Sequence, residues 1–262
     1  MNRFTKTLFA IALTTLAAQS YAAPTTKAAA SVNPAEKAKI EAVVHDYILN
    51  NPQVIVEALQ AMQRKQYEQA ELTVKKTQQT AASFAKPLFN QANDPVAGNV
   101  NGKITVVEFF DYQCPHCIDM APVIAEIIKN NADVRIVFKE FPIRGPMSEV
   151  AARAALAANI QGKYYEFSHN LLVVNKPLSE EVILDVAKKS GLDVDKLQKD
   201  MKGDVVNKQL ADNMKLAQDL KLFGTPAFFI GKTNGSTTVA YIPGQMDQKQ
   251  LQTEIDKANK AS

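Results

Sequence analysis

The sequence predicts an α/β domain that carries a helical insertion and follows a helical extension. A strand, helix and strand pattern occupies residues 104–143, as in a βαβ unit. Helical spacing then continues through residues 148–222, before two more strand patterns and a closing helix. Helical patterns also fill residues 34–83. The helices at 148–222 therefore interrupt an α/β domain, and those at 34–83 precede it.

Residues 1–22 have the layout of a secretory signal peptide. Arg3 and Lys6 precede an apolar run from residue 8 to 18, and Ser20-Tyr21-Ala22 fits a cleavage site. The apolar run is too short to span a bilayer, which needs roughly 20 residues. We therefore predict export to the periplasm, and the sequence leaves peripheral association with the outer membrane open. Residues 23–33, "APTTKAAASVN", read as a flexible lead-in.

Residues 34–84 form the predicted helical extension. Asn33-Pro34 is typical of a helix start, and "NNPQ" at 50–53 ends one helix and begins another. The second helix has only a thin apolar stripe, formed by Ile55, Leu59 and Met62. A helix with so narrow a stripe needs a partner. That partner is either the main domain or a second copy of the chain.

Residues 85–262 contain the predicted α/β domain. The turn-rich segment "NDPVAGNVNGK" at 93–103 leads into it. "ITVVEFF" predicts a buried strand, "APVIAEIIKNN" a helix and "VRIVFKEFPI" a second strand. The helical insertion has breaks at Gly162, Lys176-Pro177, Gly191 and Gly203. "TPAFFIG" and "TTVAYIPG" predict two more strands, and a final helix follows at 247–258.

The charge balance gives no reason to expect a nucleic-acid or membrane-surface partner. The chain has 30 basic and 27 acidic residues, and two of the basic ones lie in the predicted signal peptide. The mature chain would therefore be almost neutral. We predict no nucleic-acid partner.

The chain has two cysteines, Cys114 and Cys117, separated by Pro115 and His116. A structural disulfide that closes a loop of only two residues would stabilise the folded protein little. Haem attachment needs a histidine directly after the second cysteine, where Ile118 stands. A structural zinc site needs about four ligands, and the other histidines, His45 and His169, read as ordinary helix-surface residues. A redox pair and copper(I) capture by the dithiol remain.

Cys114 falls where a strand ends and a helix begins. A helix N-terminus offers free N–H groups and the positive end of a dipole, and both stabilise a thiolate. Pro115 suits the first helical turn, and His116 adds a donor or positive charge beside the sulfur. We therefore predict a lowered pKa for Cys114, as an exposed nucleophile, with Cys117 as the buried resolving thiol.

"VVEFFDYQCPHC" resembles the active-site strand and helix of the DsbA family of thiol oxidoreductases. The resemblance implies a thioredoxin fold with an inserted helical domain. It places a buried acid at Glu108, which would have a raised pKa and relay the proton of Cys117. "GTPAFFIG" resembles the loop of the family's cis-proline, which would be Pro226, with Thr225 beside it to bind substrate backbone.

The resemblance also implies partners and further roles. Substrates would be cysteine-containing exported proteins, a membrane protein of the DsbB or DsbD type would renew the redox state, and no cofactor or metal would be needed. We expect Phe109, Phe110 and Tyr112 to help shape a peptide groove. Lys139 is a candidate partner for Glu108.

Two features depart from DsbA itself and change the expected activity. DsbA has a valine at the position of Thr225. A threonine at this position resembles isomerases and ScsC-like proteins. The extension resembles the oligomerisation segment of ScsC-like and Com-type relatives, which favours a homodimer or homotrimer through the N-terminal helices. We therefore predict both disulfide formation and isomerisation. The alternatives are a copper(I)-binding or copper-tolerance protein, a disulfide reductase and a holdase chaperone.

Overall fold

The computed structural model describes residues 33–234 and 238–260. The predicted signal peptide 1–22, and the lead-in 23–33 except its last residue, lie outside the described residues. Within the described ranges, no helix combines the length and the apolar character that crossing a membrane requires. The chain divides into two compact units at Gln63/Arg64, and each is described by itself.

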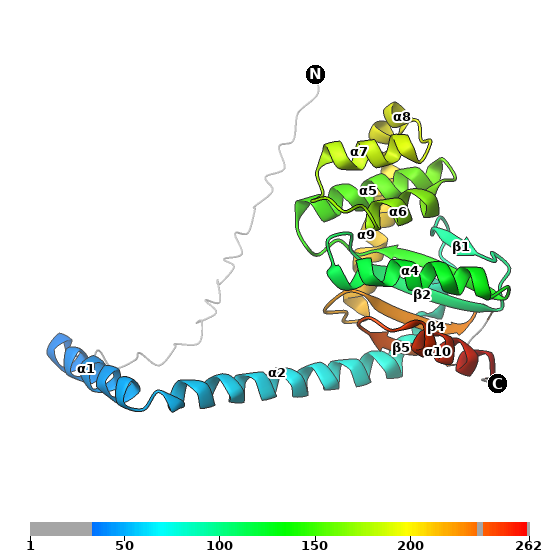
Figure 1. Ribbon diagram of the computed structural model, residues 1–262. Helices are drawn as coiled ribbons and strands as arrows, with labels where there is room; N and C mark the ends of the chain where they lie inside the picture. Colours follow the sequence, from blue (N-terminus) through cyan, green and yellow to red (C-terminus); the bar gives the residue numbers. More distant parts are fainter. Residues whose placement is uncertain (1–32, 235–237, 261–262) are drawn as a thin grey trace, which may run out of the picture. The chain divides into compact units, whose positions relative to one another are not determined.

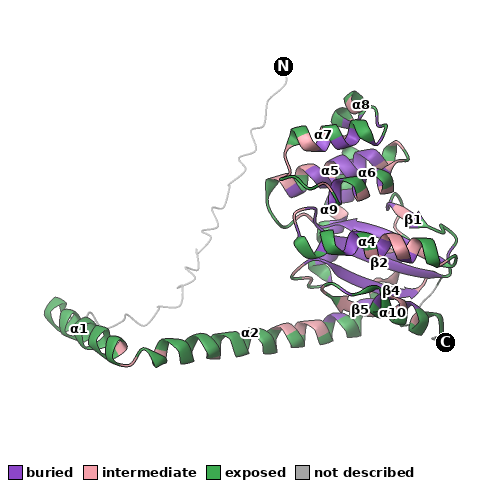
Figure 2. Cartoon of the chain, viewed as in Figure 1, coloured by how far each residue is buried: buried purple, intermediate pink, exposed green. Residues whose placement is uncertain are grey.

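The first unit holds helix α1 (Pro34–Asn50) and the first part of α2 (Gln53–Thr80). The Asn33 side chain caps α1 by accepting a 2.9 Å hydrogen bond from the Ala35 N–H, and Pro34 begins the first turn, as predicted. The break at "NNPQ" is also confirmed. Helix α1 buries no residue, and the first part of α2 is equally exposed (Figure 2).

The end of α2 belongs to the second unit. The Thr77 hydroxyl donates to the Leu220 carbonyl at 2.8 Å. The Gln78 amide donates to the Val239 carbonyl at 2.8 Å and accepts from the Tyr241 N–H at 2.7 Å. A 3₁₀ turn (Ala81–Phe84) and α3 (Ala85–Phe89) then follow. The two compact units therefore divide within α2, and the extension over residues 34–84 stays a prediction.

The second unit is built on a mixed five-stranded sheet in the order β1-β3-β2-β4-β5. The strands are β1 (Val96–Gly98), β2 (Ile104–Phe110), β3 (Val134–Glu140), β4 (Ala227–Lys232) and β5 (Ala240–Pro243). Helix α4 (Pro115–Asn130) connects the parallel pair β2 and β3, and the other pairs are antiparallel. Strand β2 is buried at every position, as its apolar sequence predicts.

Alternate residues of the central strands face two separate cores. Val106 and Phe110 join the core under α4 and α10 (Gln248–Lys260). Val107 and Phe109 join the opposite core, which includes the end of α9 and residues of α3. This alternation decides which polar residues of β2 and β3 can meet.

The insertion consists of α5 (Pro146–Ile160), α6 (Tyr164–Leu172), α7 (Glu180–Lys189), α8 (Val194–Asp200) and α9 (Asp204–Asp219). Figure 1 shows α5 to α8 gathered on one side of the sheet, while α9 leads the chain back toward β4. The breaks predicted from glycine and proline separate these helices. The structure confirms the predicted fold class, an α/β sheet domain with an inserted helical domain and an N-terminal helical region.

Candidate active site

The two cysteines lie at the start of α4, just beyond the end of β2. Cys114 is the N-cap residue of α4 and Pro115 is its first helical residue, as predicted. Both cysteines are free thiols in the structure. The Thr225–Pro226 peptide bond is cis, as the resemblance implies. The Cys114 thiol donates to the Thr225 carbonyl across 3.2 Å, so this loop and the first cysteine are in contact.

The prediction that Cys114 is exposed is wrong for this structure. Its exposed fraction is 0%, and that of Cys117 is 1%. Thr225 and Pro226 are also buried, and the thiol points at the Thr225 carbonyl rather than at solvent. A substrate sulfur therefore reaches Cys114 only when neighbouring side chains move aside.

Two opposing effects set the pKa of Cys114. Burial acts to raise it, but interactions with Thr225 and with the amide and thiol of Cys117 lower it, and so does the positive charge of Arg144. The net result is a lowered pKa, in the predicted direction. Burial raises the pKa of Cys117 well above its ordinary value, and the nearby Glu108 charge adds to that rise. The pKa values of the two thiols are therefore shifted in opposite directions.

The Thr225 hydroxyl is suited to stabilise a Cys114 thiolate. Its Oγ1 atom is buried and makes no hydrogen bond within the described part of the chain. When Cys114 is a thiol, the Thr225 hydroxyl makes no hydrogen bond with any described residue. A Cys114 thiolate could accept a hydrogen bond from this hydroxyl.

Replacing Thr225 with valine is therefore expected to raise the pKa of Cys114. Valine keeps the branched shape but removes the hydroxyl that would stabilise the thiolate. At mildly acidic pH, alkylation of Cys114 should slow by about threefold or more, because less thiolate is present. Thiolate absorbance against pH measures the shift. Thr225→Ser, which keeps the hydroxyl, is the control, and an unchanged titration in Thr225→Val would contradict this role.

The structure places His116 differently from the prediction. Its Nδ1 atom lies 2.7 Å from the Gln245 Oε1 atom, at the exposed start of α4. Among the described residues, neither cysteine sulfur has a hydrogen bond with His116. The cation that lowers the pKa of Cys114 is Arg144.

Arg144 and Asp111 are site residues that the sequence analysis missed. Asp111 is 1% exposed and accepts backbone N–H bonds from Gln113, Ile143 and Arg144 at 2.7–2.9 Å. It also accepts the Ser148 hydroxyl at 2.7 Å. This carboxylate therefore ties the segment after β3 to the cysteine loop and holds Arg144 near Cys114. The sequence could have indicated Arg144. Parallel strands end at the same edge of a sheet, so a cation just after β3 is expected near the cysteines that follow β2.

Glu108 is buried beneath the cysteines, as the resemblance implies. It is 4% exposed, and burial, with a contribution from the charge of Cys114, raises its pKa to about 8. A carboxyl group with such a pKa exchanges protons near neutral pH.

The predicted pairing of Lys139 with Glu108 is wrong. The parallel register sets Glu108 opposite Phe138 and Phe109 opposite Lys139, so the two charged side chains lie on opposite faces of the sheet. Lys139 Nζ is instead 2.6 Å from Asp94 Oδ2, in an ion pair that is almost fully buried. Burial raises the pKa of Asp94 to about 6, although Lys139 acts to lower it.

The expected groove aromatics are also internal. Phe109, Phe110 and Tyr112 are 0–2% exposed. The Tyr112 hydroxyl lies 2.8 Å from Ser168 Oγ and 3.1 Å from the Glu140 carboxylate, which also accepts from the Tyr164 hydroxyl at 2.6 Å. Apolar side chains that do reach the surface on segments beside the cysteines are Ile118, Ile143 and Phe223.

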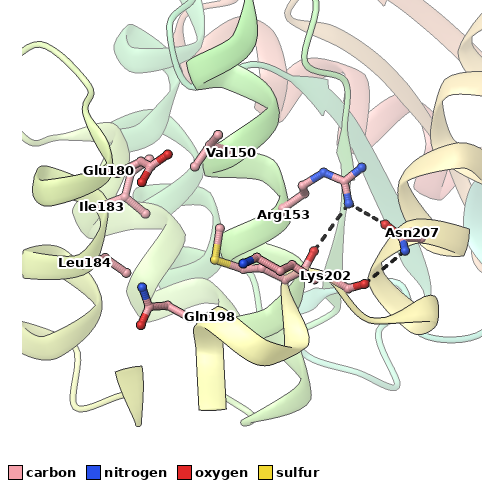
Figure 3. A pocket seen from close by; sticks show the side chains of 9 residues that line it. Val150, Arg153, Glu180, Ile183, Leu184, Gln198, Lys202 and Asn207 are labelled. Carbon is pink, nitrogen blue, oxygen red and sulfur yellow. Dashed lines mark hydrogen bonds between the residues drawn. The ribbon is translucent and has the colours of Figure 1, made fainter. Parts of the chain in front are cut away.

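A pocket of about 440 Å³ lies within the helical insertion, away from the cysteines. Residues of α5, α7 and α9 line it, together with Gln198 and the segment after α8 (Figure 3). Arg153 crosses it and donates to Asn207 Oδ1 at 2.6 Å. It contains neither a thiol nor a histidine, so it is not the redox site. Over residues 33–234 and 238–260, no cluster of three or more His, Cys, Asp or Glu side chains could hold a metal ion.

Two family models match the chain. Residues 105–256 match the DSBA-like thioredoxin domain. Residues 36–69 match the copper resistance protein ScsC N-terminal domain.

Solved structures of similar proteins cover most of the chain. A thioredoxin-like oxidoreductase from Silicibacter pomeroyi DSS-3 has 42% identity and a TM-score of 0.62, over 68% of this chain and 98% of that one. The thiol-disulfide exchange protein α-DsbA2 from Wolbachia pipientis has 28% identity and a TM-score of 0.63, over 70% and 96%. BcfH from Salmonella enterica Typhimurium has 32% identity and a TM-score of 0.62, over 86% and 96%.

Curated relatives are similar over a shorter stretch. The Na⁺/H⁺ antiporter NhaA 1 of Salinispora arenicola is 32% identical over 142 residues, which are 52% of this chain. Those residues are 21% of the antiporter, and a second Na⁺/H⁺ antiporter, NhaA 3 of Salinispora tropica, is also covered over 21%, so the chain spans about a fifth of the length of these curated relatives.

Proposed function

The chain belongs to the DSBA-like thioredoxin family, a family of thiol-disulfide exchange proteins, and from that premise we propose that it is a periplasmic thiol:disulfide oxidoreductase. It would form, and also isomerise, disulfides in exported proteins through Cys114 and Cys117. The opposed pKa shifts of these two thiols carry the proposal. The signal-peptide pattern of residues 1–22 supports the compartment.

In the oxidising direction, a substrate thiolate attacks Cys114 in the 114–117 disulfide. A bond forms between the substrate sulfur and Cys114, the bond to Cys117 breaks, and Cys117 receives the electron pair and then a proton. A second substrate thiolate attacks the mixed disulfide and leaves Cys114 as a thiolate. A membrane partner of the DsbB type would then accept the two electrons, whereas a DsbD-type partner would keep the pair reduced for isomerisation.

In the isomerising direction, the Cys114 thiolate attacks an incorrect substrate disulfide. The lowered pKa of Cys114 supports this step, because the thiolate is the reactive form. The cis loop at Thr225–Pro226 would present its backbone to an extended substrate peptide. The substrate reshuffles and leaves without net oxidation.

The first unit would join copies of the chain into a dimer or trimer. Its helices expose a set of large apolar side chains, each 46–69% accessible: Ile40, Val43, Val44, Tyr47, Leu49, Ile55, Val56, Leu59 and Met62. So many exposed apolar residues on two helices are typical of an association surface. Residues 36–69 match the ScsC N-terminal domain, which supports a second copy as the occupant.

Charge on this apolar surface is expected to abolish isomerisation while leaving thiol oxidation intact. The variant is Leu59→Glu with Met62→Glu in the mature chain, and the control is Gln60→Glu with Gln63→Glu, which adds the same charge at exposed polar positions. Reactivation of scrambled ribonuclease and the molar mass in solution are the two measurements. We expect the control to remain oligomeric and active. The variant should become monomeric, and its reactivation of scrambled ribonuclease should fall about tenfold or more.

A monomer that reactivates scrambled ribonuclease as well as the native protein would refute the role of the extension. If no form reactivates scrambled ribonuclease yet all oxidise the reduced enzyme, the protein is a plain oxidase.

Copper(I) capture is the competing function. The dithiol is a suitable soft ligand pair, and the matching N-terminal model is named for copper resistance. A copper(I) titration against a competing chelator separates the two. Tight stoichiometric binding without any thiol exchange on proteins would favour copper capture over the oxidoreductase.

A further inference from the structure

A small cavity connects Cys117 and Glu108 with helix α6 of the insertion. Its volume is about 10 Å³, close to the space that one water molecule needs. Its wall is formed by five residues with polar side chains, Glu108, Cys117, Tyr165, Ser168 and His169, and by apolar residues of α4, β3 and α6. A water at this place would have the two to four polar partners that buried waters usually have.

Glu108 has few ways to exchange its proton. Among the described residues, none donates a hydrogen bond to its carboxyl group. The titratable groups whose charges act on it or respond to it are Cys114, Cys117, Glu140 and Tyr165, and none of these is a cation. A negative charge on Glu108 is therefore relieved by a proton rather than by an ion pair.

On one side the cavity borders a buried hydrogen-bond network, and on the other it borders residues that are partly exposed to solvent. Ser168 Oγ lies 2.8 Å from the Tyr112 hydroxyl. The Tyr112 and Tyr164 hydroxyls both donate hydrogen bonds to the Glu140 carboxylate, and Tyr112, Glu140 and Tyr164 are all buried. His169 and Tyr165 are only partly buried, and their rings lie 5.9 Å apart. Burial raises the pKa of Tyr165, so it holds its proton at neutral pH. An imidazole is the side chain best suited to take up and release protons near neutral pH.

We propose that His169, acting through a water in this cavity and beside Ser168, is where protons enter and leave the Glu108–Cys117 pair. The inference rests on the proposed thiol exchange and adds a role for the helical insertion in it. His169 and Ser168 are positioning residues, because they touch neither the substrate nor the reacting sulfurs.

The two directions of exchange move one proton along this path in opposite senses. When a substrate thiolate breaks the 114–117 disulfide, the Cys117 sulfur takes the proton of Glu108, and Glu108 regains one from solvent through His169. When Cys117 resolves a mixed disulfide, Glu108 first loses its proton to solvent by this path and then takes the Cys117 proton. The Cys117 thiolate attacks Cys114 and the substrate leaves as a thiolate.

The test follows the resolving step in the full mature protein. Reduced protein is mixed with glutathione disulfide between pH 5.5 and 9, and the phase whose rate does not depend on glutathione disulfide concentration reports attack by Cys117. We expect His169→Gln to slow this phase about tenfold near pH 7, less than the roughly 10²–10⁴-fold effect of a group that exchanges its proton directly with the reacting sulfur. Free imidazole should restore the rate. Ser168→Ala should slow the same phase, and both variants should keep the native thiolate titration of Cys114.

Glu166→Gln is the matched control, because it changes an exposed residue of the same helix that does not line the cavity. An unchanged phase in His169→Gln, or a slow phase that imidazole does not restore, would overturn the inference. If the native protein exchanges no thiols with glutathione disulfide, the proposed function itself fails. Native exchange with a normal rate in His169→Gln would remove only the role of His169.

Discussion

Cys114→Ser is expected to abolish disulfide exchange, with a loss of about 10³-fold or more, because a serine hydroxyl at neutral pH is neither ionised nor able to form the mixed disulfide. The Cys114 sulfur is attacked by the substrate in the oxidising direction and attacks the substrate disulfide in the isomerising direction, and it is the atom that the Thr225 loop contacts. The loss should be equal in ribonuclease oxidation and in reactivation of scrambled ribonuclease. A holdase role would survive in this variant, whereas copper(I) capture by the dithiol would be lost together with the exchange activity.

Cys117→Ser is the informative partner of that variant. Its Cys114 thiolate can still attack a substrate disulfide, but no thiol remains to resolve the product. Covalent complexes between the protein and its substrates should therefore accumulate, visible as reductant-sensitive species on a denaturing gel. Complexes with Cys117→Ser and none with Cys114→Ser would assign Cys114 as the nucleophile. The reverse pattern would exchange the two roles.

Local patterns in the sequence predicted most of the secondary structure. Strand β2 was recognisable by its β-branched and aromatic residues, and α1 by Asn33 followed by Pro34. Strand β1 and helix α3 were missed, because three residues ending in Gly98 and five residues around Pro87 are too short to show a period. They are held by contacts with distant segments, such as the antiparallel pairing of β1 with β3.

The candidate site was predicted in part for similar reasons. The thiols, Glu108 and the cis-proline are tied to short motifs, so the sequence indicates them directly. Arg144 is held near the site by Asp111, so its place depends on the pairing of β2 with β3 and not on a short motif. The error about Lys139 was avoidable. Parallel pairing of β2 with β3 places Glu108 beside Phe138, and the alternation of side chains then sends Lys139 to the other face.

Burial of Glu108 has the second large expected effect, which is on the free energy of unfolding. The pKa of Glu108 is raised from 4.5 to about 8 in the folded protein, chiefly by burial. Between these two pH values the folded state binds more protons than the unfolded state. The free energy of unfolding therefore falls as pH rises through this window and levels off above it. The total is on the order of several kcal/mol, at about 1.4 kcal/mol per pKa unit.

Glu108→Gln is expected to remove that decline. Well below pH 4.5 the acid is protonated in both states, so the variant and the native protein should have similar stability. By pH 8 to 9 the variant should be more stable by about 4 to 5 kcal/mol, because glutamine does not have to be buried as a charge. Urea unfolding of the reduced protein at several pH values measures the slope. Glu166→Gln, at an exposed position, should follow the native curve.

The exchange kinetics of Glu108→Gln separate burial from chemistry. Glutamine cannot relay the Cys117 proton, so the resolving step should slow by about 10²-fold even though the fold is more stable. This combination of higher stability and lower activity is the mark of a buried group retained for its reaction. Parallel stability curves for the native protein and the variant would mean that Glu108 ionises as an ordinary surface acid. In that case it could not serve as the proton relay of Cys117, and His169 would have no proton to conduct.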